Sequence, residues 1–292
     1  MIPEHLIEWH NADVATQLRI KQRLLDTQTP FQHLEVVETA ALGNAFLLDG
    51  HLMSAEGDEW FYHENLNQLA ALTHPLPRSA LIIGGGDGGS ARQLLMHPSI
   101  ERIVVCELDA AVIAMALCYL PRIHQGSLED PRVEIVIGDG FDYVARSREP
   151  VDLLVLDLTD PQGHAAPLYS RQFFAECARL LGREGILCLH LCSPQLQPQE
   201  FTRLLAELSA VFACVRPILV PVMLYGGLWS LACASQSQDP KTLTQEEITH
   251  RLVQRQLGDL NYYNAETHVA ALALPNFVRE LLPPAFSCRL QK

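Results

Sequence analysis

Short apolar runs alternate with amphipathic stretches from about residue 78 onward. Apolar runs occupy residues 79–84, 102–108, 133–137, 151–156 and 185–191, and helical stretches lie around 90–96, 110–120, 142–146, 170–181 and 199–211. Continuous apolar strands separated by helices are typical of a parallel sheet that is covered on both faces. The pattern therefore predicts a doubly wound α/β domain.

The first sixty or so residues follow a different pattern. Residues 32–38, 45–48 and the stretch after Gly50 are short β-like runs. The dipeptides Gly43-Asn44 and Asp49-Gly50 interrupt them, and such dipeptides favour hairpins. We therefore predict a small antiparallel β domain over residues 1–64, followed by a nucleoside-binding α/β domain over residues 65–292.

Two more apolar runs, 215–222 and 228–234, flank Gly226-Gly227. They resemble an antiparallel pair that closes the edge of the large sheet. Helices are expected over 246–254 and 276–282.

Composition narrows the class of protein. Hydrophobic residues make up 48% of the 292 residues and charged residues 19%, as in a globular protein. No apolar run approaches the roughly 20 residues of a membrane span, and Glu4 and Glu8 are unlike a cationic leader, so we expect a cytoplasmic protein. The eight cysteines, several of them inside apolar runs, are expected to be reduced and to bind no metal.

The net charge of −13 disfavours a nucleic-acid partner, which requires a basic face. A negative field would concentrate a cationic ligand near a cleft, although solubility alone also explains acidic composition.

A glycine-rich turn follows the first strand of the α/β domain: Gly84, Gly85, Gly86, Asp87, Gly88 and Gly89. Glycines there let the backbone bend tightly and approach a ligand. Glu107 ends the second strand, near the offset at which an acid reaches a ribose, and Asp139-Gly140 ends the third. The alternative is a tight turn without a ligand. Because Asp87 would repel a pyrophosphate, the pattern favours a cationic sulfonium nucleoside over a dinucleotide.

Asp157 and Asp160 follow the fourth strand and should reach the same rim. Two more acids there are costly unless a cation occupies the site. A metal pair and simple turn formation are the alternatives, and substrate binding is favoured because no histidine or cysteine has helpful spacing.

Together these motifs resemble the spermidine synthases. The resemblance rests on Gly84–Gly89, on Cys106–Asp109, on Gly138–Gly140 and on Asp157–Pro161, and extends to Leu48–Gly50, Asp58–Glu64, Tyr262–Asn264, His268 and Leu274-Pro275. It implies a Rossmann-like, methyltransferase-type doubly wound sheet behind the small β domain. It also implies transfer of propylamine from decarboxylated S-adenosylmethionine to an amine such as putrescine, releasing methylthioadenosine, with no metal or other cofactor. A homodimer or homotetramer, joined partly through the N-terminal domain, is implied as well.

The resemblance assigns roles to single residues. Gln32, Glu107, Asp139, Gly140 and His164 would bind the donor nucleoside, beside the glycine loop of Gly84, Gly85, Gly86 and Gly88. Asp87 would hold the donor amine. Asp157 would accept a proton and Tyr62 would orient the attacking nitrogen, while His63, Asp87, Asp157, Asp160 and Tyr225 would line the acceptor site.

Several positions depart from the family pattern on the acceptor side: Met53, Leu158, His164, His190 and Leu224. Tyr225 is expected to substitute for the tyrosine that Leu224 replaces. These changes favour a more apolar acceptor channel, suited to a longer or modified amine, or else ordinary spermidine synthesis with compensating residues. An S-adenosylmethionine-dependent methyltransferase and a non-catalytic polyamine or nucleoside binder are the alternative functions.

Overall fold

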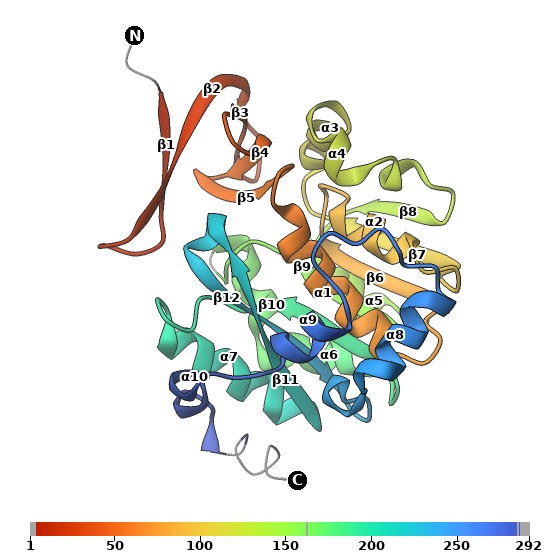
Figure 1. Ribbon diagram of the computed structural model, residues 1–292. Coiled ribbons are helices and arrows are strands. Elements are labelled where there is room, and N and C mark those ends of the chain that lie inside the picture. The colour runs from red at the N-terminus through yellow and green to blue at the C-terminus, as the bar shows by residue number, and fades with distance from the viewer. Residues whose placement is uncertain (1–3, 162, 285, 287–292) are drawn as a thin grey trace.

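The computed structural model describes residues 4–161, 163–284 and 286, which form two sheets (Figure 1). The first sheet holds five strands in sequence order, each antiparallel to the next. They are β1 (His5–Trp9), β2 (Ala15–Gln28), β3 (His33–Thr39), β4 (Gly43–Leu48) and β5 (His51–Ala55). The small antiparallel domain is thus confirmed as a fold, whereas its boundary after residue 64 stays a proposal.

Of the two hairpin turns predicted from the sequence, one is found at its predicted position. Asp49 and Gly50 form the two-residue turn between β4 and β5, with φ of 50° and 83°. Positive φ at both central residues is the hairpin geometry that Asp-Gly favours. The turn predicted at Gly43-Asn44 is wrong in position: the chain reverses at residues 40–42, and both residues already pair with β3.

The second sheet has the strand order β11-β12-β10-β9-β6-β7-β8. Its strands are β6 (Ser79–Gly84), β7 (Arg102–Glu107), β8 (Val133–Ile137), β9 (Leu153–Asp157), β10 (Ile186–His190), β11 (Cys214–Val222) and β12 (Gly227–Ser235). Strands β6 to β10 run parallel, and β12 and β11 form the predicted antiparallel pair. The chain builds outward from β6 to β8 and then returns to place β9 on the other side, so a ligand crevice is expected between β6 and β9.

The helices cover both faces of the large sheet. They are α1 (Glu59–Thr73), α2 (Gly89–Leu95), α3 (Ala110–Tyr119), α4 (Pro121–His124), α5 (Gly140–Arg146), α6 (Arg171–Leu181), α7 (Pro198–Val211), α8 (Gln245–Gln254), α9 (Ala265–Ala271) and α10 (Asn276–Glu280), with short 3-10 turns at Ser127–Glu129, Gly163–Tyr169, Met223–Tyr225 and Pro240–Thr242. Helix α1 packs on β9 and β10 beside α2, and α6 packs on the same strands beside α5 and α7. No described helix is both long enough and apolar enough to cross a membrane.

The small sheet packs against α3. Leu34, Val36 and Phe46 from β3 and β4 form one apolar cluster with Val112 and Ile113 of α3. The cluster fixes the small sheet above the carboxyl ends of β6 and β7, so residues of both sheets can contribute to one site (Figure 1).

Helix α1 is almost entirely buried and is held by the C-terminal part of the chain. Arg255 Nη1 donates to Ala71 O at 2.7 Å, and Arg255 Nη2 donates to His74 O at 3.0 Å, which satisfies carbonyls at the end of α1. The Glu64 carboxylate accepts three backbone N–H bonds of 2.7–2.8 Å from residues 261, 262 and 263. The predicted motif at Tyr262–Asn264 thus lies against α1.

Candidate active site

The glycine turn brings β6 against the end of β9. Gly84 and Gly85 have φ of 78° and 66°, and Gly85 N donates to Asp157 O at 2.9 Å. A Cβ at Gly84 would overlap that same carbonyl oxygen, so the close approach requires glycine. Gly88, with φ of 79°, begins α2 behind the turn, where a Cβ would meet His124 and Ser127.

A cavity of about 140 Å³ opens above these strand ends. Most of the predicted site residues line it: Gln32, Tyr62, His63, Gly84, Gly85, Gly86, Asp87, Glu107, Asp139, Gly140, Asp157, His164 and Tyr225. Gly88 and Asp160 are not among its lining residues. The structure therefore brings together side chains from both sheets, as the strand pattern predicted.

Glu107 lies on the wall of this cavity at the end of β7 and is 8% exposed. Burial raises the pKa of its carboxyl to about 7, while the backbone N–H groups of Asp109, Gly86 and Leu108 oppose this shift. The N–H of Asp109 donates to Oε1 at 3.0 Å. A buried carboxylate with free acceptor capacity suits a ligand that brings hydroxyl donors.

Asp139 and Gly140 form the next part of the wall. Asp139 Oδ1 accepts the N–H of Asp142 at 3.0 Å and so caps α5. A Cβ at Gly140 would overlap Ile83, which explains the glycine. Gln32 reaches the cavity from the loop before β3, where its Nε2 lies 3.3 Å from Asp109 Oδ2.

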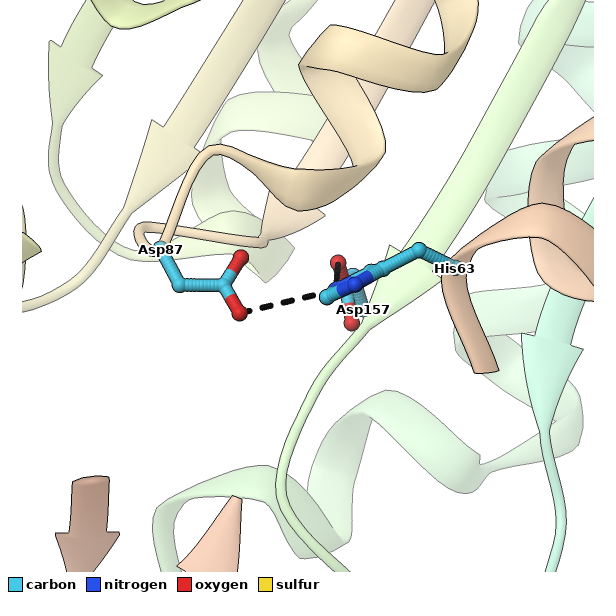
Figure 2. Close-up of side chains that lie close together, drawn as sticks. All are labelled: His63, Asp87 and Asp157. Atoms are coloured by element: carbon cyan, nitrogen blue, oxygen red, sulfur yellow. Dashed lines mark ion pairs between the residues drawn. The ribbon is translucent and has the colours of Figure 1, made fainter. Parts of the chain in front are cut away.

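His63 lies between two carboxylates at the centre of the site. Its Nε2 is 3.5 Å from Asp87 Oδ2 and 3.9 Å from Asp157 Oδ2 (Figure 2). Its Nδ1 is 2.8 Å from Glu59 Oε2, and Arg92 Nη2 donates to both oxygens of Glu59. Burial alone would lower the pKa of His63, but Asp87, Glu59 and Asp157 together raise it to about 9.

Both carboxylates beside His63 are held by hydroxyl groups. Ser54 Oγ donates to Asp87 Oδ2 at 2.9 Å, and the N–H of Gly89 donates to Asp87 Oδ1 at 2.9 Å. Tyr62 Oη donates to Asp157 Oδ1 at 3.0 Å, and Ser90 Oγ donates to Asp157 Oδ2 at 2.6 Å. Each carboxylate oxygen keeps a free acceptor site, so both carboxylates can still receive N–H groups of a ligand.

Burial is the main influence on the protonation states of Asp157 and Tyr62. Burial raises the pKa of Asp157, and Asp87 adds to the rise, whereas His63 opposes it. Burial and the neighbouring Asp157 carboxylate raise the pKa of Tyr62 well above its ordinary value, so the tyrosine stays a hydrogen-bond donor at neutral pH.

Among the described residues, His63, Asp87 and Asp157 offer ligand atoms within 4.8 Å of one another, a spacing that a metal ion could bridge. The raised pKa of His63 disfavours this use, because a protonated imidazole has no lone pair for a metal. Two carboxylates that keep acceptor capacity suit ammonium groups instead. That the site holds no metal stays a prediction.

A second cavity, of about 360 Å³, adjoins the first along Tyr62, Leu158 and Tyr225. Asp160 lines it, together with all five positions that depart from the family pattern: Met53, Leu158, His164, His190 and Leu224. Tyr225 Oη donates to Met53 O and its ring faces Tyr62 at 5.8 Å, so Tyr225 contributes to both cavities, whereas Leu224 lines only the second.

Aromatic rings form part of this second wall. The His190 ring stacks on Trp229 at 6.1 Å, and His190 Nε2 contacts the hydroxyl of Tyr169. Burial lowers the pKa of His190, with Asp160 opposing, so the ring is neutral at pH 7. The wall is therefore mixed: aromatic and apolar side chains such as Trp229 and Leu224 line it together with the carboxylates of Glu8, Asp49 and Asp160.

Some functional neighbours were not predicted from the sequence. Ser54, Ser90, Glu59, Arg92 and Trp229 all hold or adjoin predicted site residues. Only Glu59 lay within a noted motif. Conversely, Tyr263 and His268 line neither cavity: the Tyr263 hydroxyl bonds His268 Nδ1, and His268 Nε2 bonds Pro240 O.

Comparison with known proteins gives a consistent result. Residues 59–246 match the spermine/spermidine synthase domain, and residues 6–56 match the spermidine synthase tetramerisation domain. A polyamine aminopropyltransferase of Nitrosomonas europaea is 46% identical over 287 residues, which cover 98% of this chain and 88% of the relative. One from a Thermoanaerobacter species is 39% identical over 265 residues, covering 90% and 93%.

Solved structures agree with this result. A spermidine synthase in complex with the transition-state analogue AdoDATO superposes with a TM-score of 0.90 at 34% identity, covering 96% of each chain. The spermidine synthase of Thermotoga maritima gives a TM-score of 0.89 at 34% identity, covering 97% of this chain and 95% of that one. The predicted fold class and resemblance are thus confirmed, and the chain belongs to the spermine/spermidine synthase family of polyamine aminopropyltransferases.

Proposed function

We propose that this chain transfers the propylamine group of decarboxylated S-adenosylmethionine to an amine and releases methylthioadenosine. The observation that carries the proposal is the placement of Asp87 and Asp157, two carboxylates that lie 3.5 Å and 3.9 Å from His63 Nε2. Both line the first cavity, together with Tyr62 and Leu158, which line the second cavity as well. Two carboxylates this close can bind the amine of an aminopropyl donor and the attacking amine of an acceptor at the same time, and relatives named polyamine aminopropyltransferases support the assignment.

The first cavity would hold the donor. Glu107 would accept the ribose hydroxyls, Asp139 and Gly140 would contact adenine, and Gln32 and His164 would close the cavity from the side. Asp87 would bind the amine of the donor propyl group. Because a carboxylate at Asp87 repels another carboxylate, the same residue would reject intact S-adenosylmethionine.

The second cavity would hold the acceptor. An alkyl ammonium has a pKa near that of lysine, about 10.4, so the acceptor must lose a proton before it attacks. Asp157 would take that proton while Tyr62 orients the nitrogen. The new bond forms between nitrogen and the carbon beside sulfur, and the carbon–sulfur bond breaks with its electron pair moving to sulfur. Holding the three atoms in line supplies much of the acceleration.

The acceptor is proposed to be putrescine or a related longer amine. Asp160 and Tyr225 would line its channel, and the apolar side chains of Met53, Leu158 and Leu224 would contact its methylene groups. No metal or redox cofactor is needed for this reaction.

Mass-spectrometric detection of products tests the proposal. The purified chain would receive decarboxylated S-adenosylmethionine with putrescine, cadaverine, agmatine, diaminopropane or spermidine, and intact S-adenosylmethionine would serve as the control donor. Methylthioadenosine together with an aminopropylated product is expected. S-adenosylhomocysteine formed only from the intact donor would replace the proposal with a methyltransferase, and binding without turnover would replace it with a polyamine or nucleoside binder.

We also propose a homodimer or homotetramer assembled through the small sheet, since residues 6–56 match a tetramerisation domain. Light scattering of the chain with and without residues 1–56 would test this. A cytoplasmic location stays a prediction.

A further inference from the structure

His63 is buried in a way that leaves one ring nitrogen for chemistry. The side chain is 1% exposed, and a Cβ at Gly89 would overlap the ring, so the backbone of α2 fixes the ring plane. Glu59 binds Nδ1 and is itself bound by Arg92. Nε2 is the ring nitrogen directed toward Asp87 and Asp157 (Figure 2).

Charged groups face His63 from every element packed around it. Asp58 precedes α1 and Glu59 is its first residue, Asp87 lies on the turn before α2, and Asp157 ends β9. Arg92 of α2 lies beyond Glu59. Without substrates, a proton on His63 offsets part of this negative charge. An ammonium at Asp157 would supply the same positive charge nearby, so the two cations repel each other.

We propose that His63 and the acceptor nitrogen share one proton, and that His63 is the residue that finally holds the proton which the acceptor must lose. The inference deepens the aminopropyltransferase function and rests on it. Asp157 would then be the group through which the proton passes, and the imidazole Nε2 the group that keeps it during the attack.

Proton transfer occurs in two stages, one when the acceptor binds and one before the attack. Binding of the acceptor as an ammonium releases the His63 proton to solvent. The ammonium N–H bond breaks, and the proton passes by way of Asp157 Oδ2 to the lone pair of Nε2, 3.9 Å away. The neutral amine then forms the nitrogen–carbon bond, and sulfur keeps the electrons of the broken bond. Distances in a site without substrate are commonly longer than in the reacting complex.

The pH dependence of turnover tests the inference. In the wild type, kcat should rise with pH as the pair formed by His63 and the acceptor ammonium loses the first of its two protons. In His63→Gln no imidazole can hold the proton. The rising limb of the plot of kcat against pH should therefore shift to higher pH by about one to two pH units. Turnover at pH 7 should fall about tenfold or more and recover above pH 9. An unchanged limb in His63→Gln would overturn the inference.

Two further variants separate this role from a structural one. His97→Gln replaces another buried histidine, which lines neither cavity, and should leave the limb in place. Glu59→Gln keeps an oxygen for Arg92 but weakens the hold on the His63 proton. It should therefore lower the plateau of kcat and move the limb to lower pH, opposite to His63→Gln. A shift in the same direction would contradict the inference.

Calorimetry gives a readout without turnover. Putrescine would be titrated into the enzyme saturated with methylthioadenosine, which lacks the propylamine group of the donor, in buffers of different ionisation enthalpy at pH 7.5. The wild type should release about one proton on binding, and His63→Gln close to none. Release of the same number by both would overturn the proposal. If the wild type forms no methylthioadenosine from any donor and acceptor, the proposed function fails instead, which the product assay detects separately.

Discussion

Ser90 Oγ donates a hydrogen bond of 2.6 Å to Asp157 Oδ2. Ser90 belongs to the first turn of α2 and Asp157 is the last residue of β9. The bond therefore connects the helix after the glycine turn to the proposed proton acceptor. Tyr62 approaches the other carboxylate oxygen from α1, so three elements position this one carboxylate.

Replacing Ser90 with alanine should make Asp157 a poorer proton acceptor at neutral pH. The hydroxyl favours the ionised carboxylate, so its loss raises the pKa of Asp157 further above the ordinary value and leaves more of it protonated. A hydrogen bond to a charged group contributes about 1.5–3 kcal/mol, so kcat at pH 7 should fall about tenfold or more. Steady-state kinetics would measure this, and Ser235→Ala, which removes a buried hydroxyl elsewhere, should have no such effect on kcat.

Asp157→Asn should bind the donor normally and lose most turnover. Asparagine keeps the size of the side chain but cannot accept a proton, and general-base catalysis contributes about 10²–10⁴-fold. Methylthioadenosine affinity by calorimetry and product formation by mass spectrometry would separate the two effects. Turnover that stays at the wild-type level would remove Asp157 from its proposed role.

Asp87→Asn should reduce the preference for the decarboxylated donor. The variant loses the charge that would attract the donor amine and repel a carboxylate, so the KM for the decarboxylated donor should rise about tenfold or more. Inhibition by intact S-adenosylmethionine should become stronger at the same time. Competition assays with both nucleosides would test this, and equal inhibition of wild type and variant would argue that another residue selects the donor.

Donor affinity should depend on pH through Glu107. Its folded pKa of about 7 lies above the ordinary value for glutamate, so folding takes up a proton, and the contribution of Glu107 to stability declines as pH rises from about 4.5 to 7. Only the carboxylate form accepts two ribose hydroxyls, so methylthioadenosine should bind more tightly at pH 8 than at pH 6. Calorimetry of Glu107→Gln should show weaker binding with no such slope. The same slope in both proteins would contradict this assignment.

Glu64→Gln should destabilise the fold more than it changes chemistry. The carboxylate accepts three backbone N–H bonds from residues 261–263, and an amide has a single oxygen with which to accept them. Hydrogen bonds to charged groups contribute about 1.5–3 kcal/mol, so a loss of about 2 kcal/mol is expected. Urea unfolding would measure it. The exposed Glu266→Gln is the matched control and should unfold like the wild type.

The ends of the strands of the large sheet could be predicted because each strand is a local run of apolar residues. Apolar runs fixed β6 to β10 within about two residues, and a polar residue at the end of each such run lies at a shared rim whenever strands are parallel. Glu107, Asp139 and Asp157 were found in this way. Serines that hold carboxylates from another element were not, since a hydroxyl in a sequence does not reveal which carboxylate it faces.

The sequence pattern did not predict helix α1, and the reason is physical. Thirteen of its fifteen residues are buried, including Glu59, His63, Glu64, Asn65, Asn67 and Gln68, so no polar face alternates with an apolar one. The buried polar groups find partners such as Ser90 and Gln93 that only tertiary structure supplies. The long strand β2 was missed for a different reason: only Leu18 and Ile20 of its 14 residues are buried, so its apolar signal is confined to one short stretch.

Arg251 Nη1 also donates to Leu72 O and Thr73 O, so α1 is held by contacts from residues 251–263. This attachment has a consequence for synthesis on the ribosome. Tyr62 and His63 leave the exit tunnel long before Arg255 and Glu64's backbone partners are translated. During that interval the end of α1 lacks the donors that satisfy its carbonyls, even though the neighbouring strands can already assemble. Nascent chains stalled before residue 251 should therefore be inactive, and enzyme activity should appear only once nearly the whole chain has been made.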